Sequence, residues 1–69
     1  MYGRGHTAVV PDDFAAALRA APGTQAFFDG LSNSVQRFHI DKIDGAKSDD
    51  TRARRIAKSV DLFRAGKPR

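Results

Sequence analysis

The sequence predicts an all-α protein, a small bundle of four short helices. Apolar residues recur at helical spacing in four separate stretches, with prolines and glycines between them. Serine, threonine or aspartate stands where each of these stretches should begin. The chain has 69 residues, which is enough for one hydrophobic core and close to the lower limit for a domain that folds alone.

The two ends of the chain lack a helical pattern. Residues 1–9 contain two glycines and no periodicity, so we expect a flexible tail there. The alternative is a short strand over residues 8–10 that pairs with another segment. Residues 67–69 should form a second, basic tail, and the expected single helical domain covers residues 10–66.

The first two helices have recognisable start and stop signals. The first should begin at Pro11, because a proline at the first helical position has no N–H group to leave unpaired. Asp12 and Asp13 then lie at the positive end of the helix dipole, and we interpret them as helix-stabilising charges rather than as a catalytic carboxylate pair. The second helix should run from Thr24, a suitable N-cap, to Gly30.

The third and fourth helices have serine caps. The third should run from Ser32 to about Ala46, and the fourth from Ser48 to Gly66. His39 falls on the apolar stripe of the third helix. We interpret it as a packed, hydrogen-bonded side chain rather than as a metal ligand or a proton switch, since the other histidine lies in the N-terminal tail.

The expected core combines the apolar faces of the four helices. We assign the adjacent Phe27 and Phe28 to the core rather than to an exposed stacking platform, because aromatic side chains supply much of the burial in so small a chain. Ala53 and Ala57 are expected on the buried face of the fourth helix, whereas Ile40 should lie at the edge of the third. The predicted core residues are Phe14, Leu18, Phe27, Phe28, Leu31, Val35, Phe38, Ile43, Ile56, Val60 and Phe63.

Composition and charge exclude several classes of protein. The chain has no cysteine, so it forms neither a disulfide nor a thiolate metal site, and a cytoplasmic location fits this composition. Its net charge of +4 favours contact with an anionic partner. We expect no membrane insertion and no secretory signal, because the apolar runs are short. With no nucleophile–base pair, metal-ligand set or phosphate-binding loop, we expect no enzyme activity, cofactor or small-molecule substrate.

Three parts of the chain resemble a known family. They are residues 10–18, residues 26–32, and the Ala-Lys pair at 46–47 followed by Thr-Arg-Ala-Arg-Arg-Ile at 51–56. Together they resemble the YdeI/OmpD-associated family, also called the bacteriocin-protection family, over about residues 10–66. The resemblance implies a small helical module of a bacterial, cytoplasmic protein linked with envelope stress and antimicrobial-peptide resistance. It brings no catalytic residues with it.

Basic residues around the start of the fourth helix are the candidate contacts for a partner or an anion. They are Lys47, Arg52, Arg54, Arg55 and Lys58. Two roles are open for this region. Arg52 can pair with a carboxylate of the third helix, such as Asp44, and so fix the turn between the two helices. Alternatively, Lys47 and Arg52 at a helix N-terminus receive a phosphate or an acidic peptide.

The sequence therefore predicts a non-catalytic interaction module with a protein partner of unknown identity. The alternative is a nucleic-acid-binding domain in which the last two helices form a helix-turn-helix. Phosphates would then be faced by Arg52, Arg54, Arg55 and Lys58. Binding to a membrane surface needs an exposed apolar helix face. We expect every apolar stripe of this chain to be needed for the core.

Overall fold

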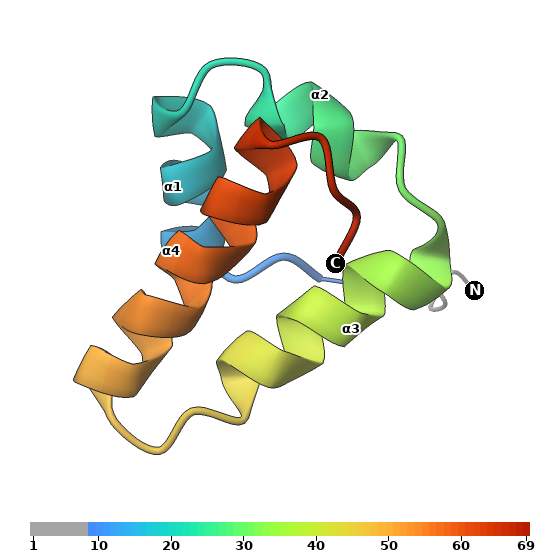
Figure 1. The fold of residues 1–69 in the computed structure, drawn as a ribbon. Helices are drawn as coiled ribbons and strands as arrows, with labels where there is room; N and C mark the ends of the chain where they lie inside the picture. Colours follow the sequence, from blue (N-terminus) through green and yellow to red (C-terminus); the bar gives the residue numbers. More distant parts are fainter. Residues whose placement is uncertain (1–8) are drawn as a thin grey trace.

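The computed structural model describes residues 9–69, which form four α-helices and no strand (Figure 1). This confirms the all-α fold of four short helices. The flexible tail predicted for residues 1–9 lies, apart from Val9, outside the described residues. The helices are α1 (Asp12–Ala20), α2 (Thr24–Asp29), α3 (Asn33–Asp44) and α4 (Asp49–Arg64).

The longest helix, α4, is the element on which the other three pack, since it contacts α1, α2 and α3. A short turn joins α3 to α4, and the two helices diverge from that turn (Figure 1). The C-terminal residues return into the space between them. No helix within residues 9–69 is both long enough and apolar enough to cross a membrane.

Serine side chains cap α3 and α4, as the sequence predicts. Ser32 Oγ accepts a hydrogen bond from the Val35 N–H at 3.3 Å, and Ser48 Oγ accepts one from the Thr51 N–H at 3.2 Å. Each bond pairs an N–H group that has no acceptor within its own helix. The two caps therefore define where α3 and α4 begin.

The prediction that Thr24 is the N-cap of α2 is wrong. Gly23 occupies the cap position with a φ of 82°, a left-handed conformation that glycine adopts without steric cost. This turn directs Thr24 into the protein, where its buried hydroxyl donates to the carbonyl oxygens of Leu18 and Ala21, 2.8 Å from each. The threonine therefore closes the C-terminal end of α1 instead of the N-terminal end of α2.

Gly66 ends α4, again as the sequence predicts. Its φ is 77°, its N–H donates to the Phe63 carbonyl at 3.0 Å, and the Lys67 N–H donates to the Leu62 carbonyl at 2.9 Å. These two bonds form a Schellman motif, which reverses the chain direction at a helix end. The last three residues are thereby turned back toward α3.

The core gathers around Phe63 of α4. Its ring centroid lies 6.5 Å from that of Phe14, 5.5 Å from that of Phe27 and 5.8 Å from that of Phe28, all within the range of favourable aromatic pairs. The buried apolar residues are Phe14, Leu18, Ala21, Phe28, Ile40, Ile43, Ile56, Val60 and Phe63. Three further predicted core residues are half-buried: Phe27, Leu31 and Val35.

The assignment of Phe38 to the core is wrong. Its side chain is 40% exposed, whereas Ile40, expected at the edge of the helix, is 5% exposed. The buried face of α3 consists of His39, Ile40 and Ile43. Gln36 also turns inward, and its amide donates to a main-chain carbonyl of α2 at 2.8 Å. The helix is therefore rotated about its axis relative to the prediction, which leaves Phe38 on the outside.

Two alanines predicted on the buried face of α4 are also exposed. α4 buries Ile56, Ser59 and Val60, while Ala53 and Ala57 lie on its surface. Ala53 and Ala57 lie with Ile56 and Val60 on the side of α4 that borders α1. The alanines consequently line a groove between the two helices.

Candidate functional site

Arg52 connects α1, α3 and α4 through its guanidinium group. Its Nε and Nη2 donate to the two carboxylate oxygens of Asp13 on α1, at 2.5 and 3.1 Å. Nη2 also lies 3.3 Å from Asp44 Oδ1, and Nη1 donates to the Ile43 carbonyl at 3.4 Å. The predicted pair with Asp44 is confirmed, and Asp13 is an additional partner that sequence reasoning missed. We refer to Arg52, Asp13 and Asp44 as the Arg52 clasp.

The charges of the Arg52 clasp stabilise one another. The hydrogen bond from Arg52 holds the pKa of Asp13 below its usual value of 3.8, and the hydrogen bond to Asp13, followed by that to Asp44, raises the pKa of Arg52. Both groups therefore stay charged at neutral pH. Because the Arg52 guanidinium is already paired with two carboxylates, the structure does not support the alternative in which it receives an external anion together with Lys47.

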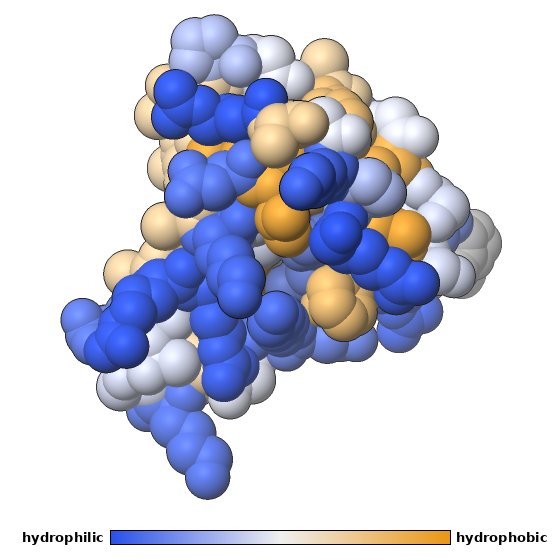
Figure 2. Space-filling view, viewed as in Figure 1, coloured by the Kyte–Doolittle hydropathy of each residue, from blue (hydrophilic) through white to orange (hydrophobic). Residues whose placement is uncertain are grey.

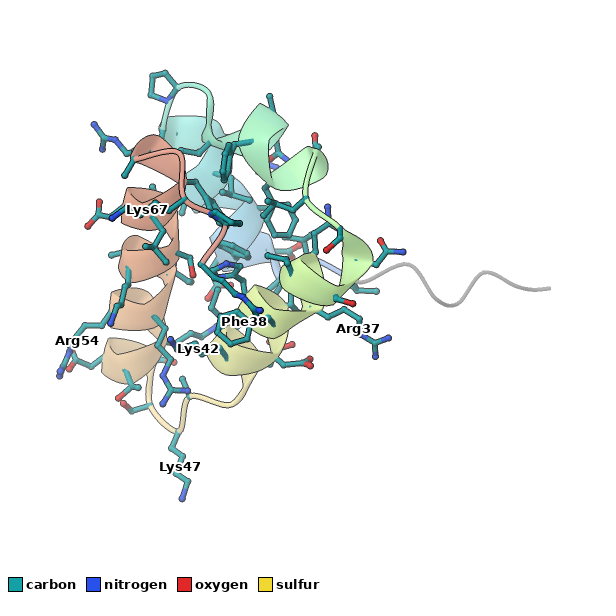
Figure 3. All side chains as sticks on the ribbon, turned by 45° about the vertical axis from the view of Figure 1, so that its right-hand side comes forward. Arg37, Phe38, Lys42, Lys47, Arg54 and Lys67 are labelled. Atoms are coloured by element: carbon teal, nitrogen blue, oxygen red, sulfur yellow. The ribbon has the colours of Figure 1, made fainter. Side chains whose placement is uncertain are left out.

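The other predicted contact residues do not form one site. Arg54 pairs with Asp50 one turn earlier on α4, and Arg55 Nη1 donates to a main-chain carbonyl of α3 at 2.7 Å. Lys47 and Lys58 are both exposed. Lys47 points into solvent from the turn between α3 and α4, whereas Arg54 leaves the side of α4 (Figure 3). Arg54 and Lys58 lie one turn apart on α4, whereas Arg52 and Arg55 are bonded to other elements.

A groove of about 560 Å³ runs between α1 and α4. Its floor is apolar and consists mostly of small side chains. Figure 2 shows weakly hydrophobic residues along the left-hand edge of the molecule, where α1 and α4 lie in Figure 1. The floor residues are Ala17, Ala20, Ala53, Ile56, Ala57 and Val60. Sequence reasoning missed this groove, because alanines at helical spacing fit a buried face and an exposed one equally well.

Carboxylates dominate the charge along this groove. Asp13 lines it together with Arg52, its partner in the clasp, so these two charges offset one another. Asp49 and Asp61 line it as well, are exposed, and take part in no ion pair within residues 9–69. The groove therefore presents an apolar floor with net negative charge beside it.

His39 joins α3 and α4 to the C-terminal residues. Its ring is buried, with Nδ1 at 2.9 Å from Ser59 Oγ and Nε2 at 2.6 Å from the Pro68 carbonyl oxygen. Because a carbonyl oxygen only accepts, Nε2 carries the proton, and in the neutral ring Nδ1 accepts from the Ser59 hydroxyl. The interpretation of His39 as a packed, hydrogen-bonded side chain is confirmed. Among residues 9–69, no group of three or more histidine, cysteine, aspartate or glutamate side chains is placed to hold a metal ion.

Comparison with protein families matches residues 7–66 to the family described as Bacteriocin-protection, YdeI or OmpD-Associated. The chain belongs to this YdeI/OmpD-associated family. The match includes all four helices and confirms the resemblance that the sequence shows. No curated protein and no solved structure matches the chain.

In this YdeI/OmpD-associated protein, the segment with the sharpest family resemblance has a structural role. The Thr51 N–H pairs with the Ser48 cap, Arg52 forms the clasp, and Arg55 bonds to a main-chain carbonyl of α3. Residues 46–56 therefore attach the start of α4 to both α1 and α3. The groove also lies within the family match, whereas residues 67–69 lie beyond it.

The Arg52 clasp predicts a pH-dependent stability for this YdeI/OmpD-associated protein. Asp13→Asn should lower the melting temperature at neutral pH, and the difference from the wild type should disappear in acid. The lowered pKa of Asp13 means that its stabilisation is complete above the usual value of 3.8 and is lost as the pH falls through the lower folded-state pKa. Circular-dichroism melts of both proteins from about pH 7 to about pH 2 check this.

Asp12→Asn is the matched control for this experiment. It removes a carboxylate from the same helical turn, and Asp12 takes part in no ion pair within the part of the chain that the structure describes. Its effect on the melting temperature should be smaller than that of Asp13→Asn at neutral pH. A destabilisation by Asp13→Asn that persists unchanged in acid would contradict the assigned role of the clasp.

Proposed function

We propose that this member of the YdeI/OmpD-associated family is a non-catalytic interaction module of a bacterial, cytoplasmic stress-resistance protein, and that its groove between α1 and α4 docks a partner protein. The observation that carries the proposal is the exposure of Ala53 and Ala57, which leaves apolar surface open on a helix whose larger apolar residues are buried. Open apolar surface beside charged residues is typical of docking surfaces.

An amphipathic helix with basic residues beside its apolar face fits this groove. The small alanine side chains of the floor allow a helix to approach closely, with apolar residues at helical spacing against the floor. Asp49 and Asp61 then face lysines or arginines of the partner, since neither is in an ion pair within residues 9–69. An acidic helix of the same shape is disfavoured, because like charges would meet along the groove.

Titration with two synthetic helical peptides tests this function. The peptides share one leucine face and differ only in carrying lysines or glutamates beside it. Only the lysine peptide should bind, and the amide NMR signals of Ala53 and Ala57 should shift as it does. Ala57→Arg should weaken binding about tenfold, because a long cationic side chain occupies the groove and repels the lysines.

Ala26→Arg provides the matched control. Ala26 is exposed on α2 and does not line the groove, so the same substitution there should leave binding of the lysine peptide unchanged. Both variants alter an exposed alanine and should melt as the wild type does. Equal binding of the two peptides, or equal weakening by the two arginine variants, would count against docking in the groove.

A further inference from the structure

A second surface of the protein is positively charged and centres on an exposed aromatic ring. Phe38 on α3 is partly exposed, with Lys42 Nζ 5.6 Å and the Arg69 guanidinium carbon 5.4 Å from its ring centroid. Lys67 is exposed, two residues before Arg69, and lies beside the upper part of α4 in Figure 3. We refer to Phe38, Lys42, Lys67 and Arg69 as the Phe38 face.

Ion pairs do not neutralise the Phe38 face. Every ion pair within residues 9–69 involves Arg52 or Arg54, and neither belongs to this face. Arg55 adds positive charge at its edge, because its Nη1 donates to the Lys42 carbonyl at 2.7 Å. Asp41 is exposed directly before Lys42 on α3 and borders the face with the opposite charge. The cations of the face are therefore available to an anionic ligand.

The C-terminal part of the Phe38 face is held in place. The Schellman motif at Gly66 fixes the backbone of Lys67, and the buried ring of His39 bonds to the Pro68 carbonyl at 2.6 Å. Arg69 follows directly and lies against the Phe38 ring. A ligand that binds this face consequently finds the backbone that carries Lys67 and Arg69 already positioned and does not have to order a free tail.

The Phe38 ring can accept a planar group. The Lys42 and Arg69 cations lie at cation–π distance from it, within about 6 Å of the centroid. Both side chains are long and flexible, so they can move from the ring to a neighbouring anion when a planar group covers the ring. The face therefore offers stacking and anion binding side by side.

We propose that the Phe38 face binds single-stranded nucleic acid, with one base stacked on Phe38 and the adjacent phosphates bound by Lys42, Lys67 and Arg69. Stacking on an aromatic side chain beside phosphate-binding cations is how proteins bind single strands without sequence preference. A duplex keeps its bases within the helix, and an acidic peptide makes no use of the ring. A membrane surface requires more apolar area than Phe38 supplies.

Fluorescence anisotropy with a labelled oligothymidylate of about 12 nucleotides tests this proposal at about 50 mM salt. The full chain should bind, and its affinity should fall steeply with added salt, because phosphate contacts release counterions. Phe38→Ala should weaken binding about tenfold, a typical loss for one stacked base. Lys42→Gln should weaken binding and reduce the slope of log affinity against log salt by about one.

Two further variants distinguish binding at the Phe38 face from attraction to the net charge of the protein. Lys47→Gln removes the same charge as Lys42→Gln, but Lys47 points away from Phe38 at the turn between α3 and α4 (Figure 3), so binding should change by less than about twofold. Phe38→Trp retains the stacking surface and should bind as the wild type does. Because the chain has no other tryptophan, quenching of its fluorescence by the oligonucleotide would report stacking directly.

Several results would overturn the proposal. Affinity that is unchanged by Phe38→Ala, or weakened equally by Lys42→Gln and Lys47→Gln, would show attraction to net charge alone. Displacement of the oligonucleotide by an equal charge concentration of oligoglutamate would assign the face to an acidic peptide. Binding to phosphatidylglycerol vesicles without oligonucleotide binding would assign it to a membrane surface. All these variants leave the α1–α4 groove unchanged, so the outcome is independent of peptide docking there.

Discussion

Phe63→Ala should leave the chain largely unfolded at room temperature. The Phe63 ring is 3% exposed and packs against Phe14 of α1, Phe28 of α2 and His39 of α3. Truncating a buried phenylalanine to alanine costs about 3–5 kcal/mol, because both transfer free energy and packing are lost. A domain of this size has a net stability of only about 3–5 kcal/mol, so the loss is comparable to the whole free energy of unfolding.

Far-UV circular dichroism and urea titration measure this loss, with Phe38→Ala as the control. The control removes the same side chain from the same protein, but at a position on α3 where the side chain is 40% exposed. It should cost about 1 kcal/mol or less. If Phe63→Ala instead melts cooperatively with a midpoint near that of the wild type, Phe63 is not central to the core.

The ends of the helices are the part of the fold that local sequence predicts well. Ser32, Ser48 and Gly66 all act where the sequence places them, because a cap bonds to backbone groups only two or three residues away. Thr24 shows the limit of this reasoning. Whether its hydroxyl caps α2 or closes α1 depends on the left-handed turn at Gly23, and a threonine before an apolar stretch fits both.

The buried face of each helix is less predictable, because it depends on the neighbouring helices. The sequence of α3 contains an apolar stripe wide enough to include Phe38 or Ile40, and the packing of the four helices buries only Ile40. In α4 the apolar pattern likewise predicts that Ala57 is buried, whereas Ala57 is exposed in the structure. The α1–α4 groove is therefore a consequence of packing that no single-helix pattern shows.

Long-range polar partners are the least predictable part of the candidate sites. The sequence suggests Asp44 as the partner of Arg52 because both flank one turn, whereas Asp13 is separated from Arg52 by 39 residues along the chain. The Phe38 face likewise depends on the hydrogen bond between His39 and Pro68, which are 29 residues apart along the chain. Charge and spacing indicate which residues can bind, but only the fold determines which of them meet.

His39→Ala should be the second most destabilising change, at roughly 3 kcal/mol. It removes a buried ring whose centroid lies 4.8 Å from that of Phe63, and it leaves Ser59 Oγ and the Pro68 carbonyl without their partner. Two causes, lost packing and lost hydrogen bonds, therefore contribute. Urea denaturation of His39→Ala gives their sum, and a second variant is needed to separate them.

His39→Phe separates these causes, because it keeps a ring against Phe63 and removes both hydrogen bonds. It should cost about 1–3 kcal/mol, the penalty for an unpaired buried polar group. Adding Ser59→Ala should recover part of that loss, since removing both partners is nearly neutral. NMR relaxation should also show Arg69 becoming mobile in His39→Phe, because the bond from Nε2 to the Pro68 carbonyl holds the chain end. Wild-type stability together with an ordered Arg69 in His39→Phe would mean that packing alone, and not this bond, keeps the chain end beside α3.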